Sequence, residues 1–488
     1  MSATPLGSIV SCGAYLPRLR LPRARIAEAM GWLRPESSTP SGARSVCNWD
    51  EDALTLAVEA ARECVRAAGT APRIGSVSLA STTLPFADRS NATLLAGALD
   101  LPEDVETADV AGSLRAGTTA LAQAARRSDG AARLVVASDA RVARPGSPQE
   151  MEFGAGAAAL LVTDAANDTR QAPALASILA TAHRAADFVD HYRMQGESFD
   201  YSLEERWVRD EGLLKLVPEV IGQTLCAAGI EPARIDRIVV GGSAGTASRI
   251  AKLAGLGHAR LQDGLREDCG DTGTAHPLLM LAAALEEGAP GEQVLLVGFG
   301  QGVDVLLIRL AAARPAQGPR AVSSALARRR TEAHYARYLA HAGLLEVDFG
   351  MRAERDNRSA QSVAWRKHRA LTAFVGGRCQ SCGTVQFPRS RVCVNPECRK
   401  TDTQADHRLA DSLGRVKSFT EDWQAFSPRP PCVYGNVEFE DGGNLMMELT
   451  DVDSGEIAVG ARVRFMFRIK DRDALRGFRR YFWKAVRA

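Results

Sequence analysis

The residues of this chain that are best suited to chemistry are four cysteines in its last quarter. Cys379 and Cys382 enclose two residues, and after ten further residues Cys393 and Cys398 enclose four. Two tight turns of this kind bring four sulfurs within reach of one tetrahedral Zn²⁺, about 2.3 Å from the metal. Four thiolates leave no coordination position open, so we predict a structural zinc site, with four metal-free thiols as the alternative.

A second candidate site is the stretch D-V-A-G-S-L-R-A-G-T-T-A-L at residues 109–121, which reads as a strand end, a turn at Gly112 and a helix start. Such corners often present a nucleophile, because a helix N-terminus lowers a thiol pKa and stabilises an anion. This corner has no cysteine, and its nearest nucleophilic atom is the Ser113 hydroxyl. A serine needs a base within about 3 Å, so the stretch predicts either a serine site or a shell without a nucleophile.

A third group lies in the stretch C-G-D-T-G-T-A-H-P at residues 269–277. Asp271 would serve as a base if burial raised its pKa, and its alternative role is a helix cap. His276 begins a helix next to Pro277, where it is either an acid–base group or a packing or capping residue. Cys269 is interpreted as a small buried apolar residue.

The composition is that of a soluble globular protein with two to four domains. The chain has 488 residues, of which 45% are hydrophobic and 24% charged, and its formal net charge is +2. That charge gives no general argument for binding nucleic acid or a membrane. No run approaches the roughly 20 apolar residues of a membrane span, and the start lacks a signal-peptide pattern. We therefore expect a cytoplasmic protein whose cysteines are thiols or ligands rather than disulfides.

An internal repeat organises residues 1–312. The triplet A-A-G occurs 160 residues apart, and each copy is followed by a Pro turn and an apolar strand. Each half then continues with a Gly corner, an Ala-rich helix, an apolar strand and a Gly-rich strand. We predict two α/β halves related by duplication, at 1–165 and 166–312.

The remaining residues predict three further parts. Residues 313–370 read as a Pro- and Ala-rich linker followed by charged helices, 371–411 as the zinc ribbon, and 412–488 as short strands. The E-D-G-G turn between alternating runs predicts a hairpin, and the strand number suits a small OB-fold barrel. Residues 351–400 contain eleven Arg or Lys against three Asp or Glu. This basic stretch is compatible with nucleic acid, with coenzyme A phosphates, or with a solvated face.

The first 312 residues resemble the thiolase superfamily, in its branch of HMG-CoA synthase and β-ketoacyl synthase III. The resemblance rests on G-A-Y-L-P-R-L-R-L, S-T-T-L-P-F, the corner, E-F-G-A-G-A-A-A-L-L-V and the pair G-D-T-G-T-A-H-P and G-F-G-Q-G. The remainder resembles the zinc-ribbon/OB-fold family that accompanies thiolases, through G-R-C-Q-S-C-G-T-V-Q-F-P-R, P-P-C-V-Y-G-N-V-E-F and Y-F-W-K-A-V. Together these resemblances imply a duplicated five-layer α/β fold followed by a helical segment, a zinc ribbon and an all-β barrel.

The chemistry that this resemblance implies is a Claisen-type condensation of acyl thioesters by Cys, His and Asn. The family's cysteine position falls here on Leu114, its histidine position near Ala244, and its asparagine position on Asp271. The segment S-T-T-L-P has no Glu where HMG-CoA synthases place a base. A leucine cannot form a thioester, so the fold is interpreted as stripped of its usual chemistry.

We therefore predict an auxiliary, catalytically degenerate subunit of an acyl-CoA acyltransferase complex. The resemblance implies a homodimeric thiolase-like part, and a zinc-ribbon/OB part that binds an acyl-CoA thioester and docks a thiolase or acetyl-CoA acetyltransferase-like partner. The alternative is an active condensing, retro-Claisen or decarboxylating enzyme that uses Ser113 or Asp271. Nucleic-acid binding by the ribbon and barrel is the third hypothesis, which the clustering of Phe and Trp at the C-terminal end disfavours.

Overall fold

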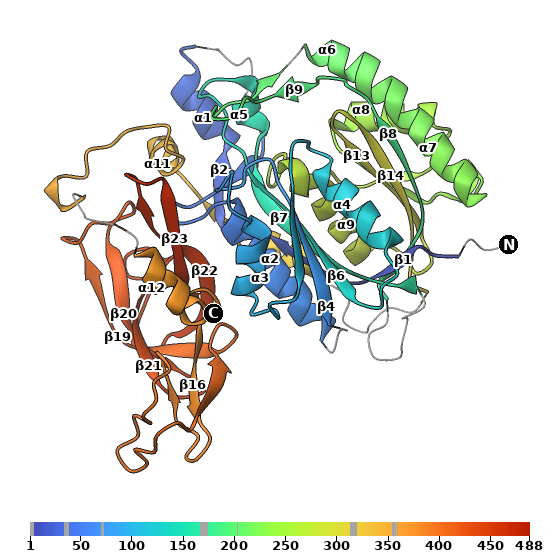
Figure 1. The fold of residues 1–488 in the computed structure, drawn as a ribbon. Helices are drawn as coiled ribbons and strands as arrows, with labels where there is room; N and C mark the ends of the chain where they lie inside the picture. The colour runs from blue at the N-terminus through green and yellow to red at the C-terminus, as the bar shows by residue number, and fades with distance from the viewer. Residues whose placement is uncertain are drawn as a thin grey trace. The chain divides into compact units, whose positions relative to one another are not determined.

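The computed structural model (Figure 1) describes residues 4–33, 39–69, 73–165, 174–202, 204–312, 320–353, 358 and 360–488. The chain forms two compact units. The first comprises Met1–Cys47, Asp52–Thr93 and Pro102–Tyr338, and the second comprises Asn48–Glu51, Leu94–Leu101 and Leu339–Ala488.

A ten-stranded sheet forms the frame of the first unit, in the order β12-β11-β13-β14-β8-β1-β7-β6-β4-β5. The strands of the first half are β1 (Gly7–Tyr15), β4 (Ile74–Ala80), β5 (Glu106–Val110), β6 (Ala132–Ala140) and β7 (Ala155–Thr163). Those of the second half are β8 (Ala176–Ala185), β11 (Arg237–Val240), β12 (Arg260–Leu261), β13 (Gln293–Phe299) and β14 (Gly302–Leu310). Read outward from the β1–β8 pair, the two halves have the same strand succession and directions, as a duplication requires.

Five main helices complete five layers in this unit (Figure 1). They are α2 (Ala53–Ala68), α4 (Ala116–Arg126), α7 (Leu214–Ala228), α8 (Ala244–Leu253) and α9 (His276–Glu287). The helix α3 (Asn91–Ala98) is divided between the units, because Leu94–Leu101 belongs to the second. The first half is covered by α2, which packs on β1, β6 and β7, and the second by α7, which packs on β8 and β14. Between the sheet halves, α4 and α9 contact each other and strands of both halves, which confirms the expected five-layer fold.

The signals that fix the outer helices are local. Asp52 begins α2 with a capping box, in which its carboxylate accepts from the Thr55 amide at 3.0 Å and the Thr55 hydroxyl accepts from the Asp52 amide at 2.9 Å. The two A-A-G triplets end α2 and α7, and Gly69 and Gly229 take the positive φ of 58° and 63° that such ends need.

Shorter elements complete the first unit. A small sheet pairs β15 (Arg330–Thr331), β2 (Leu19–Pro22) and β3 (Ala43–Val46), and β9 (His191–Tyr192) pairs with β10 (Tyr201–Ser202). The helical segments are α1 (Arg23–Met30), α5 (Pro148–Glu152), α6 (Glu205–Trp207), η2 (Val208–Leu213), η3 (Pro232–Arg234), η4 (Gly273–Ala275), α10 (Ala321–Ala327) and α11 (Tyr335–His341), whose last residues belong to the second unit. Across the described ranges, no helix combines the length and the apolar character needed to cross a membrane.

The second unit contains two sheets. The ribbon has β16 (Val375–Cys379) between β17 (Val385–Gln386) and β18 (Gln404–Arg408). The barrel has the order β21-β20-β19-β22-β23, with β19 (Leu413–Asp422), β20 (Cys432–Phe439), β21 (Asn444–Glu448), β22 (Arg462–Asp473) and β23 (Phe478–Arg487). A bridge between Leu449 and Ala485 brings the two edges of the barrel together. The predicted E-D-G-G hairpin joins β20 to β21, with positive φ at Gly442 and Gly443.

The stretch predicted as linker and helices, 313–370, is divided between the units. Its described part holds α10, α11, η5 (Met351–Ala353) and α12 (Gln361–Arg366), and α13 (His368–Thr372) runs past its end. The units change at Tyr338–Leu339, inside this stretch. Residues 313–319 of the predicted linker, and residue 166 at the predicted boundary between the halves, lie outside the described residues.

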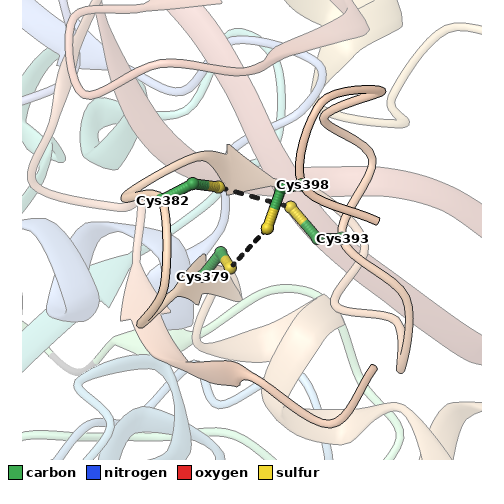
Figure 2. Close-up of side chains that lie close together, drawn as sticks. All are labelled: Cys379, Cys382, Cys393 and Cys398. Atoms are coloured by element: carbon green, nitrogen blue, oxygen red, sulfur yellow. Dashed lines mark hydrogen bonds between the residues drawn. The ribbon is translucent and has the colours of Figure 1, made fainter. Parts of the chain in front are cut away.

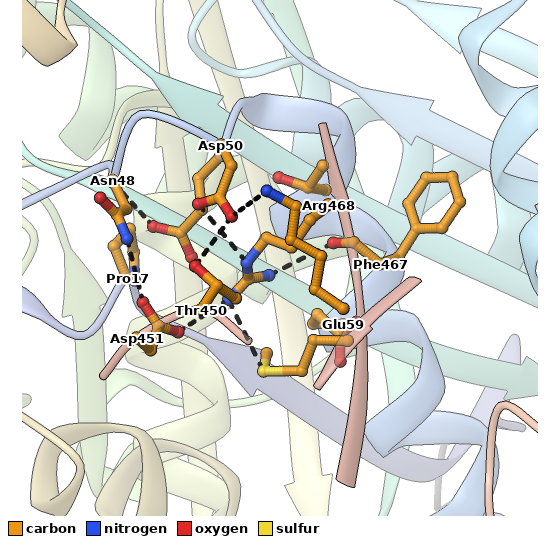
Figure 3. A network of polar contacts seen from close by, with 12 residues as sticks. Pro17, Asn48, Asp50, Glu59, Thr450, Asp451, Phe467 and Arg468 are labelled. Carbon is orange, nitrogen blue, oxygen red and sulfur yellow. Dashed lines mark hydrogen bonds and ion pairs between the residues drawn. The ribbon is translucent and has the colours of Figure 1, made fainter. Parts of the chain in front are cut away.

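A buried ionic network joins the segment Asn48–Glu51 to the barrel strands of its own unit (Figure 3). The Arg468 guanidinium lies 3.1 Å from carboxylate oxygens of both Glu51 and Asp451. The Lys484 ammonium lies 3.0 Å from Asp50, which also accepts from the Thr450 hydroxyl at 2.8 Å. All five charged side chains are at least nine-tenths buried, so each charge depends on its partners.

The Lys484 ammonium also lies 3.1 Å from Glu448, so the charges in this network do not cancel: four carboxylates face two cations. Burial, together with the carboxylates of Asp451 and Asp50, raises the pKa of Glu51 to about 7, although Arg468 and the amide of Asn48 lower it. A carboxyl whose folded-state pKa is raised contributes stability that is complete below its unfolded value and is lost as the pH rises through the folded value. Glu51 therefore favours the folded barrel at mildly acidic pH.

Arg468→Met tests the network. We expect the substitution to lower the free energy of unfolding of the second unit by about 3–5 kcal/mol, because it removes one cation and leaves buried carboxylates unpaired. The measurement is differential scanning calorimetry of the full chain. Arg462→Met is the control, since Arg462 is half exposed in its pair with Glu440 and should cost less than about 1 kcal/mol. Equal losses in both variants would contradict the role of burial.

Candidate functional site

The four predicted zinc ligands converge in the ribbon (Figure 2). The Sγ atoms of Cys379 and Cys398 lie 3.9 Å apart, those of Cys382 and Cys393 lie 3.6 Å apart, and all four lie within 4.8 Å of one another. The end of β16 supplies Cys379, and the turn at Gly383, with φ of 78°, returns the chain after Cys382. These separations are those of ligands around one tetrahedral ion.

The thiols differ in how easily they ionise. Hydrogen bonding from the Thr403 hydroxyl, followed by the amides of Cys382 and Ser381, lowers the pKa of Cys379 to about 6 despite partial desolvation. The amide of Asn395 lowers the pKa of Cys393, but desolvation and the three other cysteines raise it to about 12. Four adjacent thiols therefore cannot all ionise at neutral pH without a cation among them. The donor set fits a structural Zn²⁺.

The strand-to-helix corner places Ser113 and Leu114 against the loop between β13 and β14. The turn at Gly112 has φ of 86°, and α4 begins at Ala116. The Ser113 hydroxyl donates to the carbonyl of Gly300 at 2.7 Å and accepts from the Arg115 amide at 3.3 Å. A Cβ atom at Gly300 would lie 2.8 Å from the Ser113 oxygen, so this close approach requires glycine. The Ser113 hydroxyl thus bonds to backbone groups and to no base among the described residues.

A fully buried carboxylate, Asp304, lies beneath the corner. It accepts hydrogen bonds from Arg115 at 2.9 Å, from the hydroxyls of Thr118 and Thr119 at 3.1 and 2.6 Å, and bonds to Nδ1 of His183 at 3.0 Å. These contacts fix the first turns of α4 to β14 and β8. Sequence reasoning missed Asp304, although a single acid inside the apolar run G-V-D-V-L-L-I is a signal for such a role.

A second fully buried carboxylate, Asp139, explains the segment S-T-T. Asp139 accepts from the hydroxyls of Ser81, Thr82 and Thr83 at 3.0, 3.1 and 2.8 Å, and from the Thr82 amide at 2.8 Å. It also accepts from the amide of Thr274 at 2.7 Å. The S-T-T segment lacks the Glu that HMG-CoA synthases place there. Its hydroxyls instead donate to a buried carboxylate, which holds the S-T-T loop against the turn before α9.

Asp271 and His276 lie in that turn. The carboxylate of Asp271 accepts a hydrogen bond at 2.8 Å from the amide of Gly273, the first residue of the short helical turn η4. Burial raises the pKa of Asp271, but His276, Arg141 and Arg266 together with that amide bring it below its usual value. Burial lowers the pKa of His276, whose Nδ1 lies 3.3 Å from the amide of Thr272. The raised pKa that a base at Asp271 would need is therefore not found.

The structure brings the corner and the Asp271 turn close together. A Cβ atom at Gly117 in α4 would lie 2.8 Å from the carbonyl oxygen of Thr274. Ala244 is exposed and is the first residue of α8, which Ser243 caps through the Thr246 amide at 3.2 Å. Cys269 is buried, and burial raises the pKa of its thiol to about 12, as suits a small apolar residue.

Curated relatives of this chain include hydroxymethylglutaryl-CoA synthases of archaea. The enzyme of Archaeoglobus fulgidus is 30% identical over 315 residues, which are 62% of this chain and 88% of the relative. That of Methanosarcina acetivorans is 30% identical over 306 residues, which are 60% and 85%. The chain belongs to the hydroxymethylglutaryl-CoA synthase family. This family membership agrees with the resemblance of the first 312 residues to the thiolase superfamily.

Models of two further domains match the second unit. The rubredoxin-like zinc ribbon domain of ChsH2 matches residues 368–404, and the C-terminal OB-fold domain of ChsH2 matches residues 408–468. The protein is therefore a hydroxymethylglutaryl-CoA synthase-like chain fused to a zinc-ribbon/OB-fold domain, as predicted.

Solved structures confirm the fold of the first unit. OleA from Xanthomonas campestris has a TM-score of 0.55 at 20% identity, covering 63% of this chain and 100% of its own. MvaS in complex with 3-hydroxy-3-methylglutaryl coenzyme A has a TM-score of 0.54 at 19% identity, covering 69% and 91%. At these identities the likeness concerns the fold alone.

Zinc analysis tests the ribbon. We expect the purified protein to hold one Zn²⁺ per chain by plasma mass spectrometry, and Cys379→Ser or Cys393→Ser to lose it, because each removes one of four ligands. Cys226→Ser is the control, since this exposed cysteine lies in α7. Retention of zinc in both ligand variants would contradict the assignment.

Proposed function

We propose that this protein is an auxiliary subunit of an acyl-CoA acyltransferase complex, which binds an acyl-CoA thioester without forming a covalent acyl-enzyme. The observation that carries the proposal is the corner, where Leu114 stands at the position implied for the family's cysteine. The Ser113 hydroxyl beside it donates to a backbone carbonyl rather than to a base. The exposed Ala244 stands near the position implied for the family's histidine. We place this subunit in the cytoplasm.

The second unit offers surfaces suited to a coenzyme A handle. Trp365 is 73% exposed and stacks on His368 with ring centroids 5.1 Å apart. Arg366 and Lys367 stand between them in the sequence and are exposed. An aromatic plane beside two cations suits an adenine ring and its phosphates.

A separate group of apolar side chains on this unit suits a protein partner. Met351 and Trp423 are 82% and 66% exposed, and Phe349 packs edge-on against Phe426 at 5.5 Å. Contiguous apolar patches on a protein surface are a feature of interaction sites. We name Phe349, Met351 and Trp423 the docking patch and propose a thiolase or acetyl-CoA acetyltransferase-like protein as its partner.

We also propose that the first unit forms a homodimer. The strand β5 is a five-residue edge of the ten-stranded sheet, and most of its side chains are exposed. Such an edge carries unpaired backbone groups that a second copy of the chain can use. The opposite edge, β12, has only two residues.

The alternative, an active enzyme that uses Ser113 or Asp271, has weaker support. The hydroxyl of Ser113 has no base among its described partners, and the pKa of Asp271 is lowered rather than raised. An ionised carboxylate of lowered pKa is a poor general base at neutral pH.

Intact-mass spectrometry after incubation with acetyl-CoA separates these two functions. We expect no acetylation of the wild-type chain, because leucine has no nucleophilic atom. Leu114→Cys should gain one acetyl group that hydroxylamine removes, since its thiol would lie at the N-terminus of α4. Acetylation of the wild type that Ser113→Ala abolishes would instead establish the alternative.

Co-expression with a thiolase or acetyl-CoA acetyltransferase-like protein from the same genome tests the complex. We expect the two proteins to co-purify, and Met351→Glu or Trp423→Glu to reduce recovery of the thiolase at least tenfold, because each places a charge in the docking patch. Leu475→Glu is the matched control, since Leu475 is 80% exposed in the turn between β22 and β23. Failure of the wild-type pair to co-purify would overturn the partner.

A further inference from the structure

The segment after β8 crosses the loops of the candidate site in the first unit. Arg193 donates to the carbonyl of Thr82, in the S-T-T loop, and Asp200 pairs with Arg141 at 2.6 Å. Gln301, in the loop beside the corner, donates to the carbonyl of His191 at 3.4 Å. We call residues 186–202 the strap. Its three contacts reach the S-T-T loop, the strand end after Asp139 and the loop that binds Ser113.

The strap holds an imidazole and a carboxylate in contact. Nδ1 of His191 lies 2.9 Å from Oδ2 of Asp190, and their side chains are 16% and 10% exposed. The other oxygen of Asp190, Oδ1, is buried with no hydrogen-bond partner in the described part of the chain. No described residue hydrogen-bonds Nε2 of His191. A carboxylate on one ring nitrogen orients the other as the nitrogen that exchanges protons.

The pair lies next to the corner rather than at the far end of the strap. The amide of Ala186 is 3.5 Å from the carbonyl of Gln301, and Phe188 packs on Phe299 with ring centroids 6.2 Å apart. Residues 186–191 therefore run beside 299–301. Gln301 follows Gly300, whose carbonyl accepts a hydrogen bond from the Ser113 hydroxyl.

The other imidazoles near the corner are committed to structural contacts. His183 bonds to Asp304 through Nδ1 and to Arg126 through Nε2, so both its nitrogens are used. His276 is 3% exposed and contacts Thr272 within its own turn. His191 alone among these three combines a carboxylate partner, partial exposure and a second nitrogen without a partner in the described chain.

We propose that His191, oriented by Asp190, is the acid–base residue of this site and moves a proton at the α-carbon of a bound acyl-CoA. This inference rests on the proposed function in one respect, that the first unit holds the acyl end of the thioester. His191 Nε2 takes the proton, the α C–H bond breaks, and its electron pair moves to the thioester oxygen to give an enolate. Return of a solvent proton from the imidazolium restores the thioester, so no oxidant, nucleophile or second substrate is consumed.

This step needs neither a cysteine nor a covalent intermediate. The enolate carries its charge on oxygen, and the N-terminus of α4 at the corner favours a negative charge. The protein would then form the enolate of a bound thioester. Leu114 has no nucleophilic atom, so the thioester would not acylate the protein at this position. The substrate class is an acyl-CoA with at least one α-hydrogen.

Deuterium exchange tests the proposal with the full chain. The protein is incubated with acetyl-CoA in deuterated buffer, and the deuterium content of acetyl-CoA is followed by mass spectrometry. We expect wild-type protein to accelerate exchange, and His191→Gln to reduce the acceleration at least a hundredfold, within the range of general acid–base catalysis. The fold should survive this change, because the strap is held there by the backbone carbonyl of His191.

Two further variants distinguish proton transfer from a structural role. Asp190→Asn should lower the exchange rate and leave the binding of acetyl-CoA unchanged, because the ring of His191 loses the carboxylate that orients it. His258→Gln, at an exposed position after α8, should change neither. Acetyl-CoA affinity, measured by calorimetry, should be equal in all variants.

The outcomes separate this proposal from the function on which it rests. Equal exchange in wild type and His191→Gln, or no exchange by a wild-type protein that binds acetyl-CoA, overturns His191 as the acid–base residue and leaves the binding function intact. No binding of acetyl-CoA by the wild type overturns both.

Discussion

The first unit depends on the close approach of two helix backbones, those of α4 and of the turn that begins α9. Gly117 leaves no room for a side chain against the carbonyl of Thr274, and Gly298 leaves none against the side chain of Thr118. These positions bring the corner, the Asp271 turn and the loop at Gly300 together. Because the approach is made by backbone, it does not depend on which side chain stands at residue 114. The geometry of the corner is therefore compatible with different side chains at residue 114.

Two buried carboxylates stabilise the arrangement of loops and helices that these glycines allow. Asp304 fixes the first turns of α4 to β14 and β8, and Asp139 fixes the S-T-T loop to the turn before α9. Each is fully buried and surrounded by hydroxyl, amide or cationic donors, and removing donors from such a group costs more than the bonds themselves contribute. The loops around the corner are thus held in place by contacts that involve neither Leu114 nor Ala244. The strap contacts this frame and carries the imidazole of His191.

Much of the fold could be predicted from the sequence because its signals are local. The A-A-G triplets end α2 and α7, the E-D-G-G turn joins β20 to β21, and the cysteine spacing places four sulfurs together. The partners of Asp139 and Asp304 could not be predicted, since their donors come from segments more than fifty residues away. The same reason hides the pairing of His191 with the Gly300 loop. Sequence spacing shows which residues can react, but only the fold shows which partners they keep.

The short segment Asn48–Glu51 has a consequence for how this protein can be divided. It lies early in the chain, yet it belongs to the second unit and supplies Asp50 and Glu51 to Lys484 and Arg468. Cutting the gene at the junction of Tyr338 and Leu339 would give the second piece both cations and leave two of their carboxylates on the first. In a split version of this protein, the second piece could complete its buried ionic network only by binding the segment Asn48–Glu51 of the first piece. Fusion into one chain supplies one such segment for every barrel.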